Sequence, residues 1–152
     1  YKRFSRDINK NIKLYWFRLF YVYGNGQRIG SLIPTIINSI KNNKKLTLYN
    51  INKKHDYIFI DDVVNIISYF SKKKIPSGIY NVGTGKLTSN KVIYQYIKNK
   101  INFKYNNMQV INNNHNNKTI WSSNKKINKY FKIKTKSNIY KNLDQILEAY
   151  TN

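Results

Sequence analysis

The sequence predicts an α/β fold with parallel strands, and three observations support that prediction. Residues 14–23 form a nearly continuous apolar and aromatic run that ends at Gly24-Asn25-Gly26. Residues 32–40 place their apolar side chains on one face of a helix. Further short apolar runs alternate with helical patterns along the rest of the 152 residues. Such alternation is typical of α/β architectures rather than helical bundles, and the length suits one domain or part of one.

The first forty residues predict a helix end, a strand and a complete helix. Residues 1–10 have the charged faces of a helix tail. The run 14–23 indicates a strand covered on both faces, because a strand with one solvated face would alternate apolar and polar residues. Ser31 is the expected N-cap of the helix over 32–40, and Pro34 is tolerated in its first turn.

Two short strands are then expected at 45–49 and 57–60. A helix follows directly, and its apolar side comprises Val63, Val64, Ile66, Ile67 and Phe70. Asp61 and Asp62 stand at its start, where negative charge stabilises the free amides of a helix N-terminus. We therefore interpret this pair as capping residues and not as a catalytic acid and base.

The second half continues the alternation. A turn at 76–78 precedes a strand over 79–82, and Thr88 or Ser89 is expected to cap a helix that reaches Ile101. The Asn-rich stretch 112–118 predicts a surface loop, and two short helices are expected near 124–130 and 140–150.

Composition limits the classes of function. Lys and Arg outnumber Asp and Glu by 28 to 6, a formal charge of +22, and 24 of those cations are Lys. Lysine is spread along the chain together with 25 Asn and 23 Ile, which indicates drift toward A/T-rich codons rather than a specific nucleic-acid partner. With no Cys and two His, neither disulfides nor a metal site are expected. The apolar runs are too short to cross a membrane, so we expect no membrane partner.

Taken one at a time, the candidate motifs identify no activity. Gly24, Gly26 and Gly30 miss the Gly-x-Gly-x-x-Gly spacing of a dinucleotide-binding turn by one residue. His55 and Asp56 are expected to be a surface polar pair, since no nucleophile motif accompanies them. The Tyr94-x-x-x-Lys98 spacing is expected to be coincidental in a chain rich in both residues.

Taken in order, four blocks resemble the C-terminal half of NAD-dependent epimerases/dehydratases, members of the extended short-chain dehydrogenases/reductases that act on nucleotide sugars. The blocks are Arg18–Gln27, Gly30–Pro34, His55–Val64 and Gly78–Gly85, and the likeness extends over roughly residues 1–150. It implies the C-terminal part of a Rossmann-type parallel sheet plus a small α/β substrate-binding subdomain. Residues 1–30 would end the cofactor-domain sheet, and 31–152 would be mainly substrate-binding within one partial domain.

The resemblance also implies roles for individual residues. Phe20 would lie near the nicotinamide of NAD or NADP. A nucleotide-sugar substrate would contact residues at the end of the strand and in the segment that follows: Leu19, Tyr21, Gln27, Arg28, Ser31 and Leu32. It would also contact His55, which stands where many members have an arginine that binds the diphosphate. Tyr21 and Asn25 depart from the usual Asn and Pro at their positions.

No catalytic residue is predicted within the chain. The family's Tyr-x-x-x-Lys pair and glycine-rich cofactor turn would precede Tyr1, and the sole Met is Met108, so we expect a piece of a longer protein. The parent would be a cytoplasmic NAD(P)-dependent enzyme, in surface-polysaccharide biosynthesis, and homodimers are common among the proteins it resembles. Alone, the chain is expected to be inactive, with an unpaired strand edge and apolar faces that favour aggregation. A small basic nucleic-acid-binding module and a non-catalytic remnant of a decayed gene remain alternatives.

Overall fold

The computed structural model describes residues 12–101, 108–111, 119–132 and 138–151. The predicted helix tail at 1–10 and the whole of the predicted loop at 112–118 fall outside these ranges. In chain order the elements are β1 (Tyr15–Leu19), β2 (Tyr21–Tyr23), α1 (Leu32–Lys41), β3 (Leu46–Tyr49), β4 (Lys54–His55), β5 (Tyr57–Phe59), α2 (Ile60–Lys72), β6 (Gly78–Val82), β7 (Thr88–Ser89), α3 (Asn90–Ile101), β8 (Met108–Ile111), a 3₁₀ turn η1 (Ile127–Lys129) and α4 (Ile139–Thr151).

The predicted parallel pairing is confirmed. β1 pairs with β6, β2 pairs with β5, and β3 pairs with β8, all in parallel, while β4 and β7 form a short antiparallel pair. The single strand expected over 14–23 is two strands, because the chain changes partner at Phe20. Its first part is bonded to β6 and its second part to β5.

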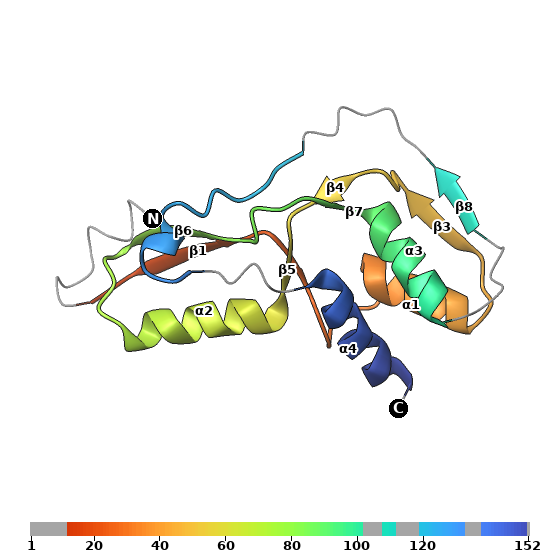
Figure 1. Ribbon diagram of the computed structural model, residues 1–152, viewed down its shortest axis with the longest axis horizontal. Helices are drawn as coiled ribbons and strands as arrows, with labels where there is room; N and C mark the ends of the chain where they lie inside the picture. The colour runs from red at the N-terminus through yellow and green to blue at the C-terminus, as the bar shows by residue number, and fades with distance from the viewer. Residues whose placement is uncertain (1–11, 102–107, 112–118, 133–137, 152) are drawn as a thin grey trace.

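One end of the molecule consists of β1 and β6 with α2 lying along them (Figure 1). Tyr80, Val82 and Phe70 are buried there, and Tyr15 and Phe17 of β1 pack against the same cluster. Alternate side chains of a strand point to opposite faces, so Trp16 and Arg18 lie on the other face of β1. Trp16 is 45% exposed. The expectation that this strand is covered on both faces is therefore wrong for the described residues.

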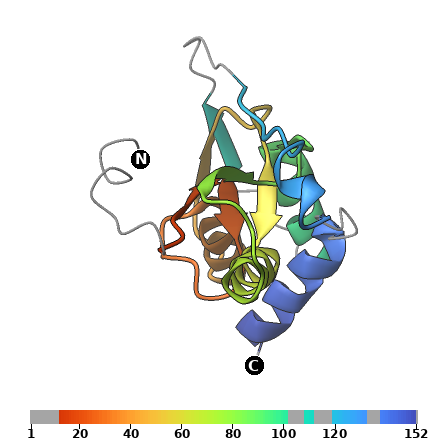
Figure 2. The same cartoon turned by 90° about the vertical axis from the view of Figure 1, so that its left-hand side faces the viewer.

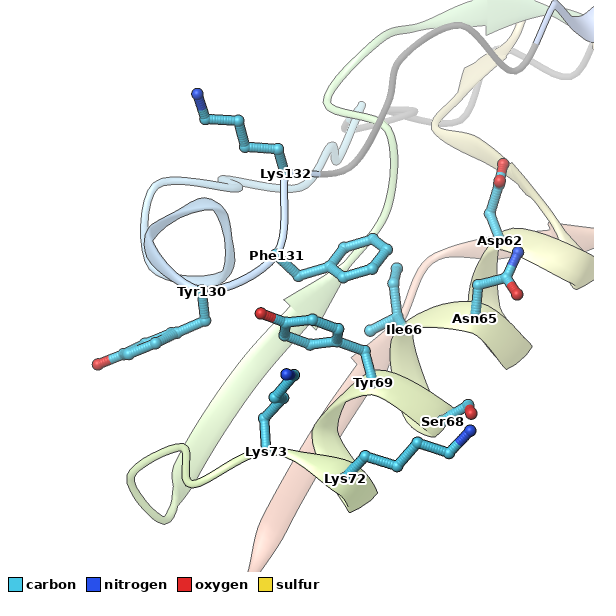
Figure 3. Close-up of a pocket in the computed structure, with 10 residues that line it drawn as sticks. All are labelled: Asp62, Asn65, Ile66, Ser68, Tyr69, Lys72, Lys73, Tyr130, Phe131 and Lys132. Carbon is cyan, nitrogen blue, oxygen red and sulfur yellow. The ribbon is translucent and has the colours of Figure 1, made fainter.

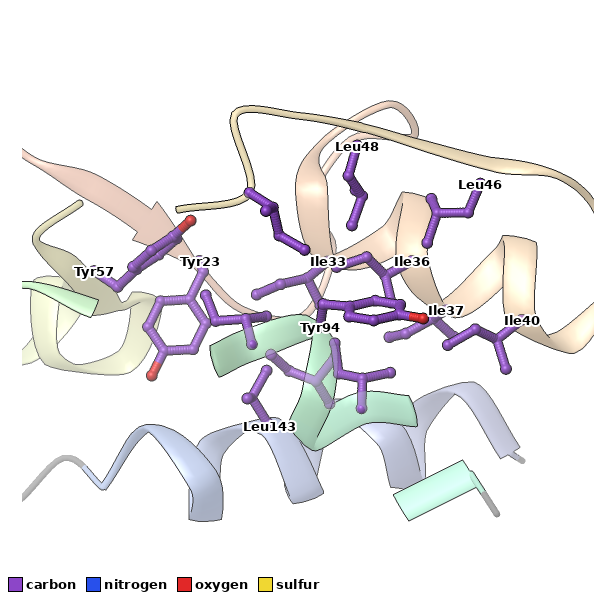
Figure 4. Packing of buried hydrophobic residues seen from close by; sticks show 14 of the residues in the cluster. Tyr23, Ile33, Ile36, Ile37, Ile40, Leu46, Leu48, Tyr57, Tyr94 and Leu143 are labelled. Atoms are coloured by element: carbon purple, nitrogen blue, oxygen red, sulfur yellow. The ribbon is translucent and has the colours of Figure 1, made fainter. Parts of the chain in front are cut away.

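The other end is a helical layer against β3 and β8, which lies behind the sheet end in the end-on view of Figure 2. α1, α3 and α4 enclose a cluster in which Ile36, Ile37, Ile93 and Ile97 are fully buried (Figure 4). Tyr23, Tyr57 and Phe59 extend this cluster toward the first end. Its residues recur three and four positions apart on each helix, as the sequence predicts.

Several helix ends differ from expectation. Ser31 stands at the N-cap of α1 but its side chain makes no capping hydrogen bond. α2 begins at Ile60 with Phe59 at the N-cap, so Asp61 and Asp62 lie in the first turn and are not caps. They can act there through their charge. The helix expected near 124–130 is the single turn η1, while the helix expected near 140–150 is α4.

Candidate functional site

The site that the sequence predicts follows the carboxyl end of β1, where β6 also ends. The Phe20 amide donates to the Val82 carbonyl at 3.1 Å, and the Tyr21 amide donates to the Asp56 carbonyl at 3.0 Å. The chain thus crosses from β6 to β5 within two residues. In open α/β sheets, ligands bind in the crevice outside the carboxyl ends of the parallel strands. Phe20 and Tyr21 stand at such a position.

Two predicted substrate residues, Tyr21 and His55, are in direct contact. Their ring centroids are 4.6 Å apart, and the Tyr21 ring also lies 4.6 Å from that of Tyr57. Burial and the nearby charge of Lys53 both lower the pKa of His55 below its usual value of 6.5. The imidazole is therefore neutral at pH 7, and it does not supply the permanent positive charge that an arginine would.

Asp56 corrects the expectation of a surface pair with His55, because it is buried with 1% of its surface exposed. Its carboxylate accepts hydrogen bonds from the amides of Thr84, Gly85 and Ser122 at 2.7, 3.0 and 2.9 Å. The hydroxyls of Thr84 and Ser122 donate to it as well, both at 2.6 Å. Burial raises the pKa of Asp56, but these hydrogen bonds outweigh burial and the net shift is downward. Asp56 is thus an ionised structural centre and not a base.

Gly83 makes this arrangement possible. A Cβ on Gly83 would lie 2.6 Å from both Asp56 Oδ2 and Ser122 Oγ, closer than side chains pack. Sequence reasoning missed the roles of Asp56, Thr84 and Ser122 because their partners are 28 to 66 residues away. One local signal was available: Asp56 directly precedes the buried strand β5.

The loop between β2 and α1 contains the remaining predicted contacts. The Gln27 side-chain amide donates to the Val22 carbonyl at 3.4 Å, which holds the loop against β2. The Ser31 amide donates to the Arg28 carbonyl at 3.2 Å, and the side chain of Arg28 is exposed. Gly24 has a φ of +153°, and a Cβ there would overlap the Ile60 side chain, so this position requires glycine.

Two further predicted substrate residues are Leu32 and Leu19. Leu32 packs against the helical core, so part of its surface is engaged there, and Leu19 is 49% exposed at the end of β1. The structure therefore joins Tyr21 to His55 and Gln27 to β2.

Other candidates do not form sites. Tyr94 of the Tyr94-x-x-x-Lys98 spacing is 5% exposed inside the helical core, which agrees with a coincidental match. Within the described ranges, no three His, Cys, Asp or Glu side chains gather as metal ligands would. The same ranges contain no helix with the length and hydropathy to cross a membrane.

A cavity of about 620 Å³ lies elsewhere, between the outer side of α2 and residues 130–132 (Figure 3). Tyr69 and Phe131 form part of its wall with ring centroids 5.1 Å apart, and Lys72, Lys73 and Lys132 surround it. None of the predicted site residues lines this cavity. This cavity is therefore separate from the candidate site.

Comparison with known proteins identifies the family. A family model described as the NAD dependent epimerase/dehydratase family matches residues 5–83, a range that contains every predicted site residue. The chain belongs to this family. Membership confirms the resemblance found in the sequence, and it favours part of an enzyme over the nucleic-acid-binding alternative.

Individual relatives agree. The chain is 37% identical to CDP-abequose synthase of Salmonella muenchen over 83 residues, covering 53% of this chain and 28% of that protein. It is 33% identical to dTDP-4-dehydro-6-deoxyglucose reductase of Escherichia coli over 110 residues, covering 68% and 34%. The crystal structure of the Bordetella bronchiseptica enzyme WbmG in complex with NAD and UDP matches with a TM-score of 0.79 at 20% identity, covering 93% of this chain and 45% of that one.

The structural likeness confirms the predicted Rossmann-type α/β fold with parallel strands. The chain spans about a third or less of these two curated relatives and less than half of the solved chain.

Proposed function

We infer that this chain supplies the nucleotide-sugar-binding part of an NAD(P)-dependent epimerase, dehydratase or reductase. The observation that carries the proposal is the family match over residues 5–83 together with the contact between Tyr21 and His55 beyond the end of β1. Relatives named for CDP- and dTDP-linked sugars support the substrate class. The parent enzyme acts in surface-polysaccharide sugar biosynthesis, in the cytoplasm, and associates with a second copy of itself.

In this proposal the described residues bind and orient the substrate. Leu19 at the end of β1 and Tyr21 at the start of β2 face the sugar or its diphosphate. The loop over residues 24–31 covers the nucleotide, and Arg28 supplies the positive charge that neutral His55 lacks. Arginine suits this task because its guanidinium stays charged at all physiological pH values and can bind two phosphate oxygens at once.

The fit to NAD(P) is limited to one residue of this chain. Phe20 is partly buried at the carboxyl end of β1 with its amide fixed by Val82, a position suited to one face of a nicotinamide. The chain contains no Gly-x-Gly-x-x-Gly turn to hold the cofactor's phosphates. When bound in the parent, the cofactor exchanges a hydride with a sugar carbon. Among the residues proposed for the site, Phe20 alone is assigned to that cofactor.

The test is a binding comparison on the 152-residue chain. Ligand-observed NMR at about 200 mM salt, which screens loose adsorption to a basic surface, is used with UDP, dTDP and CDP, each alone and linked to glucose. Inorganic pyrophosphate and NAD are the reference ligands. We expect at least one nucleotide sugar to bind more tightly than pyrophosphate, and NAD to bind more weakly than that nucleotide sugar.

Two variants sharpen the test. Arg28→Gln is expected to weaken binding of the nucleotide sugar roughly threefold to tenfold, the size of one hydrogen bond in a solvent-exposed position. Lys45→Gln, which removes an equal charge from an exposed position before β3, is expected to change little. Tight NAD binding without nucleotide-sugar binding, or nucleotide sugars that bind no better than pyrophosphate, would overturn the proposed function.

A further inference from the structure

Three aromatic rings pack together next to the candidate site. Tyr21 comes from β2, His55 from β4 and Tyr57 from β5. The Tyr21 ring lies 4.6 Å from each of the other two, and the His55 and Tyr57 rings are 5.7 Å apart. Tyr57 is 4% exposed, whereas Tyr21 retains 36% of its surface. Tyr21 is therefore the outer member of this aromatic stack, in which it meets His55 at a tilt of 37° and Tyr57 edge to face at 60°.

The support is fixed by hydrogen bonds. The Tyr57 hydroxyl donates to Asn90 Oδ1 at 2.7 Å, and both residues are buried. Asp56, between His55 and Tyr57 in the chain, is held by Thr84, Gly85 and Ser122, and its carbonyl accepts the Tyr21 amide. The stack is therefore preorganised, so a ligand that uses it pays little to order the protein.

The two supporting rings, His55 and Tyr57, carry no charge near neutral pH. Burial and the charge of Lys53 lower the pKa of His55, so its imidazole is neutral. Burial and the neighbouring Tyr21 raise the pKa of the Tyr57 hydroxyl, so this group keeps its proton and is also uncharged. An uncharged aromatic surface is a poor partner for a diphosphate. It suits the apolar face of a ligand, because the electron-rich face of a ring attracts weakly positive C–H groups.

We propose that Tyr21, supported by His55 and Tyr57, is a platform for the C–H face of the sugar ring of the nucleotide sugar. This inference rests on the proposed function and deepens it by assigning this surface to the sugar and not to the diphosphate. Tyr21 is then a specificity residue, since a sugar ring with axial hydroxyls on the facing side packs less closely on the platform.

The experiment separates the sugar from the nucleotide. For the best-binding nucleotide, dissociation constants are measured for the nucleoside diphosphate and for its glucose derivative, and their ratio reports the contribution of the sugar. Tyr21→Ala is expected to change the dissociation constant of the nucleoside diphosphate by less than about twofold. It is expected to reduce the gain in affinity that glucose provides by about twofold to tenfold. Tyr21→Phe keeps the ring and is expected to retain the gain, as is Tyr49→Ala, an exposed tyrosine of β3.

His55→Arg is a second test that does not depend on how well Tyr21→Ala folds. It replaces a supporting ring with a permanent cation, so the platform predicts a smaller gain from glucose. The platform is overturned if Tyr21→Ala weakens binding of the nucleoside diphosphate and of its glucose derivative equally, or changes neither affinity. So does a His55→Arg variant that binds the diphosphate more tightly with an unchanged gain from glucose. Failure of the proposed function is distinct, because the unmodified chain then binds neither ligand better than pyrophosphate.

Discussion

The two ends of the molecule bury their apolar residues to different extents. At the helical end, α1, α3 and α4 close around a core in which Ile36, Ile93 and Ile97 have no exposed surface. At the sheet end, α2 covers one face of β1 and β6, while Trp16 on the other face is 45% exposed. The chain therefore completes one core with its own described residues and leaves the second sheet half covered.

One edge of β1 is also left open at the sheet end, within the part of the chain that the structure describes. Over the ranges that the structure describes, β1 is hydrogen-bonded to β6 alone, so its other edge carries unpaired backbone groups. Such an edge can accept another strand, which is a common route to aggregation. The described residues therefore complete their own packing at the helical end, whereas the sheet end leaves a face and a strand edge open to contact with other protein.

The largest expected effect tests this difference directly. Ile36→Ala removes three carbon atoms from the closed core and is expected to lower the free energy of unfolding by about 3 kcal/mol. Trp16→Ala removes a much larger side chain from the open face, yet it is expected to cost less than about 1 kcal/mol. Urea unfolding followed by far-UV circular dichroism measures both. If Trp16→Ala were as costly as Ile36→Ala, the open face would be covered in solution and the comparison would fail.

Much of this organisation follows from the sequence. The spacing of Ile33, Ile36, Ile37 and Ile40 predicts α1 and its buried face, and the apolar run before Gly24 predicts parallel strands. These features depend on neighbours within one or two turns of chain. Family motifs supplied the position of the site, which periodicity alone does not reveal.

Features set by distant partners were not predicted. The break at Phe20 depends on where β5 and β6 lie, and β8 pairs with β3 from about sixty residues away. The burial of Asp56 depends on Thr84 and Ser122, which no local pattern connects to it. The stack of Tyr21 on His55 likewise arises only when β2 and β4 come together, although both residues were predicted as site members from the resemblance.

The second prediction concerns Asp56, which joins the sheet end to the segment at 119–123. Asp56→Asn keeps the shape but replaces a charged acceptor with an amide that needs two acceptors of its own. We expect the free energy of unfolding to fall by about 2–3 kcal/mol at pH 7. Thermal unfolding measures the loss. Asp61→Asn, an exposed carboxylate on α2, is the control and is expected to change stability by less than about 0.5 kcal/mol.

The pH dependence of stability gives an independent readout. Because the folded pKa of Asp56 is lowered, its contribution is fully present above the unfolded value near 3.9 and is lost as pH falls through the folded value. The unmodified chain is expected to lose stability more steeply than Asp56→Asn as pH falls below about 5. Parallel acid profiles for the two proteins would contradict an ionised Asp56.

The third prediction addresses the space beside Asp56. Gly83→Ala introduces a methyl group 2.6 Å from Asp56 Oδ2 and Ser122 Oγ, so the carboxylate or the serine must move. A cost of about 1–3 kcal/mol is expected. Ser123→Ala, on an exposed neighbour of Ser122, serves as the control. Chemical-shift mapping should show the Thr84 and Ser122 amides perturbed in Gly83→Ala, and an unperturbed pair would mean that Asp56 does not hold these amides.

The smallest expected effect compares two helix starts. Ser89 Oγ accepts the Val92 amide at 3.4 Å at the start of α3, whereas Ser31 stands at the N-cap of α1 with no side-chain hydrogen bond. Ser89→Ala is expected to cost about 0.5–1 kcal/mol, and Ser31→Ala less than that. Both are measured by urea unfolding. Ser31 lies in the loop proposed to cover the nucleotide, so ligand binding is the matching test. Ser31→Ala should weaken binding of the nucleotide sugar, whereas Ser89→Ala should leave that affinity unchanged. A Ser31 variant that loses stability but not affinity would make this serine a cap and remove it from the site.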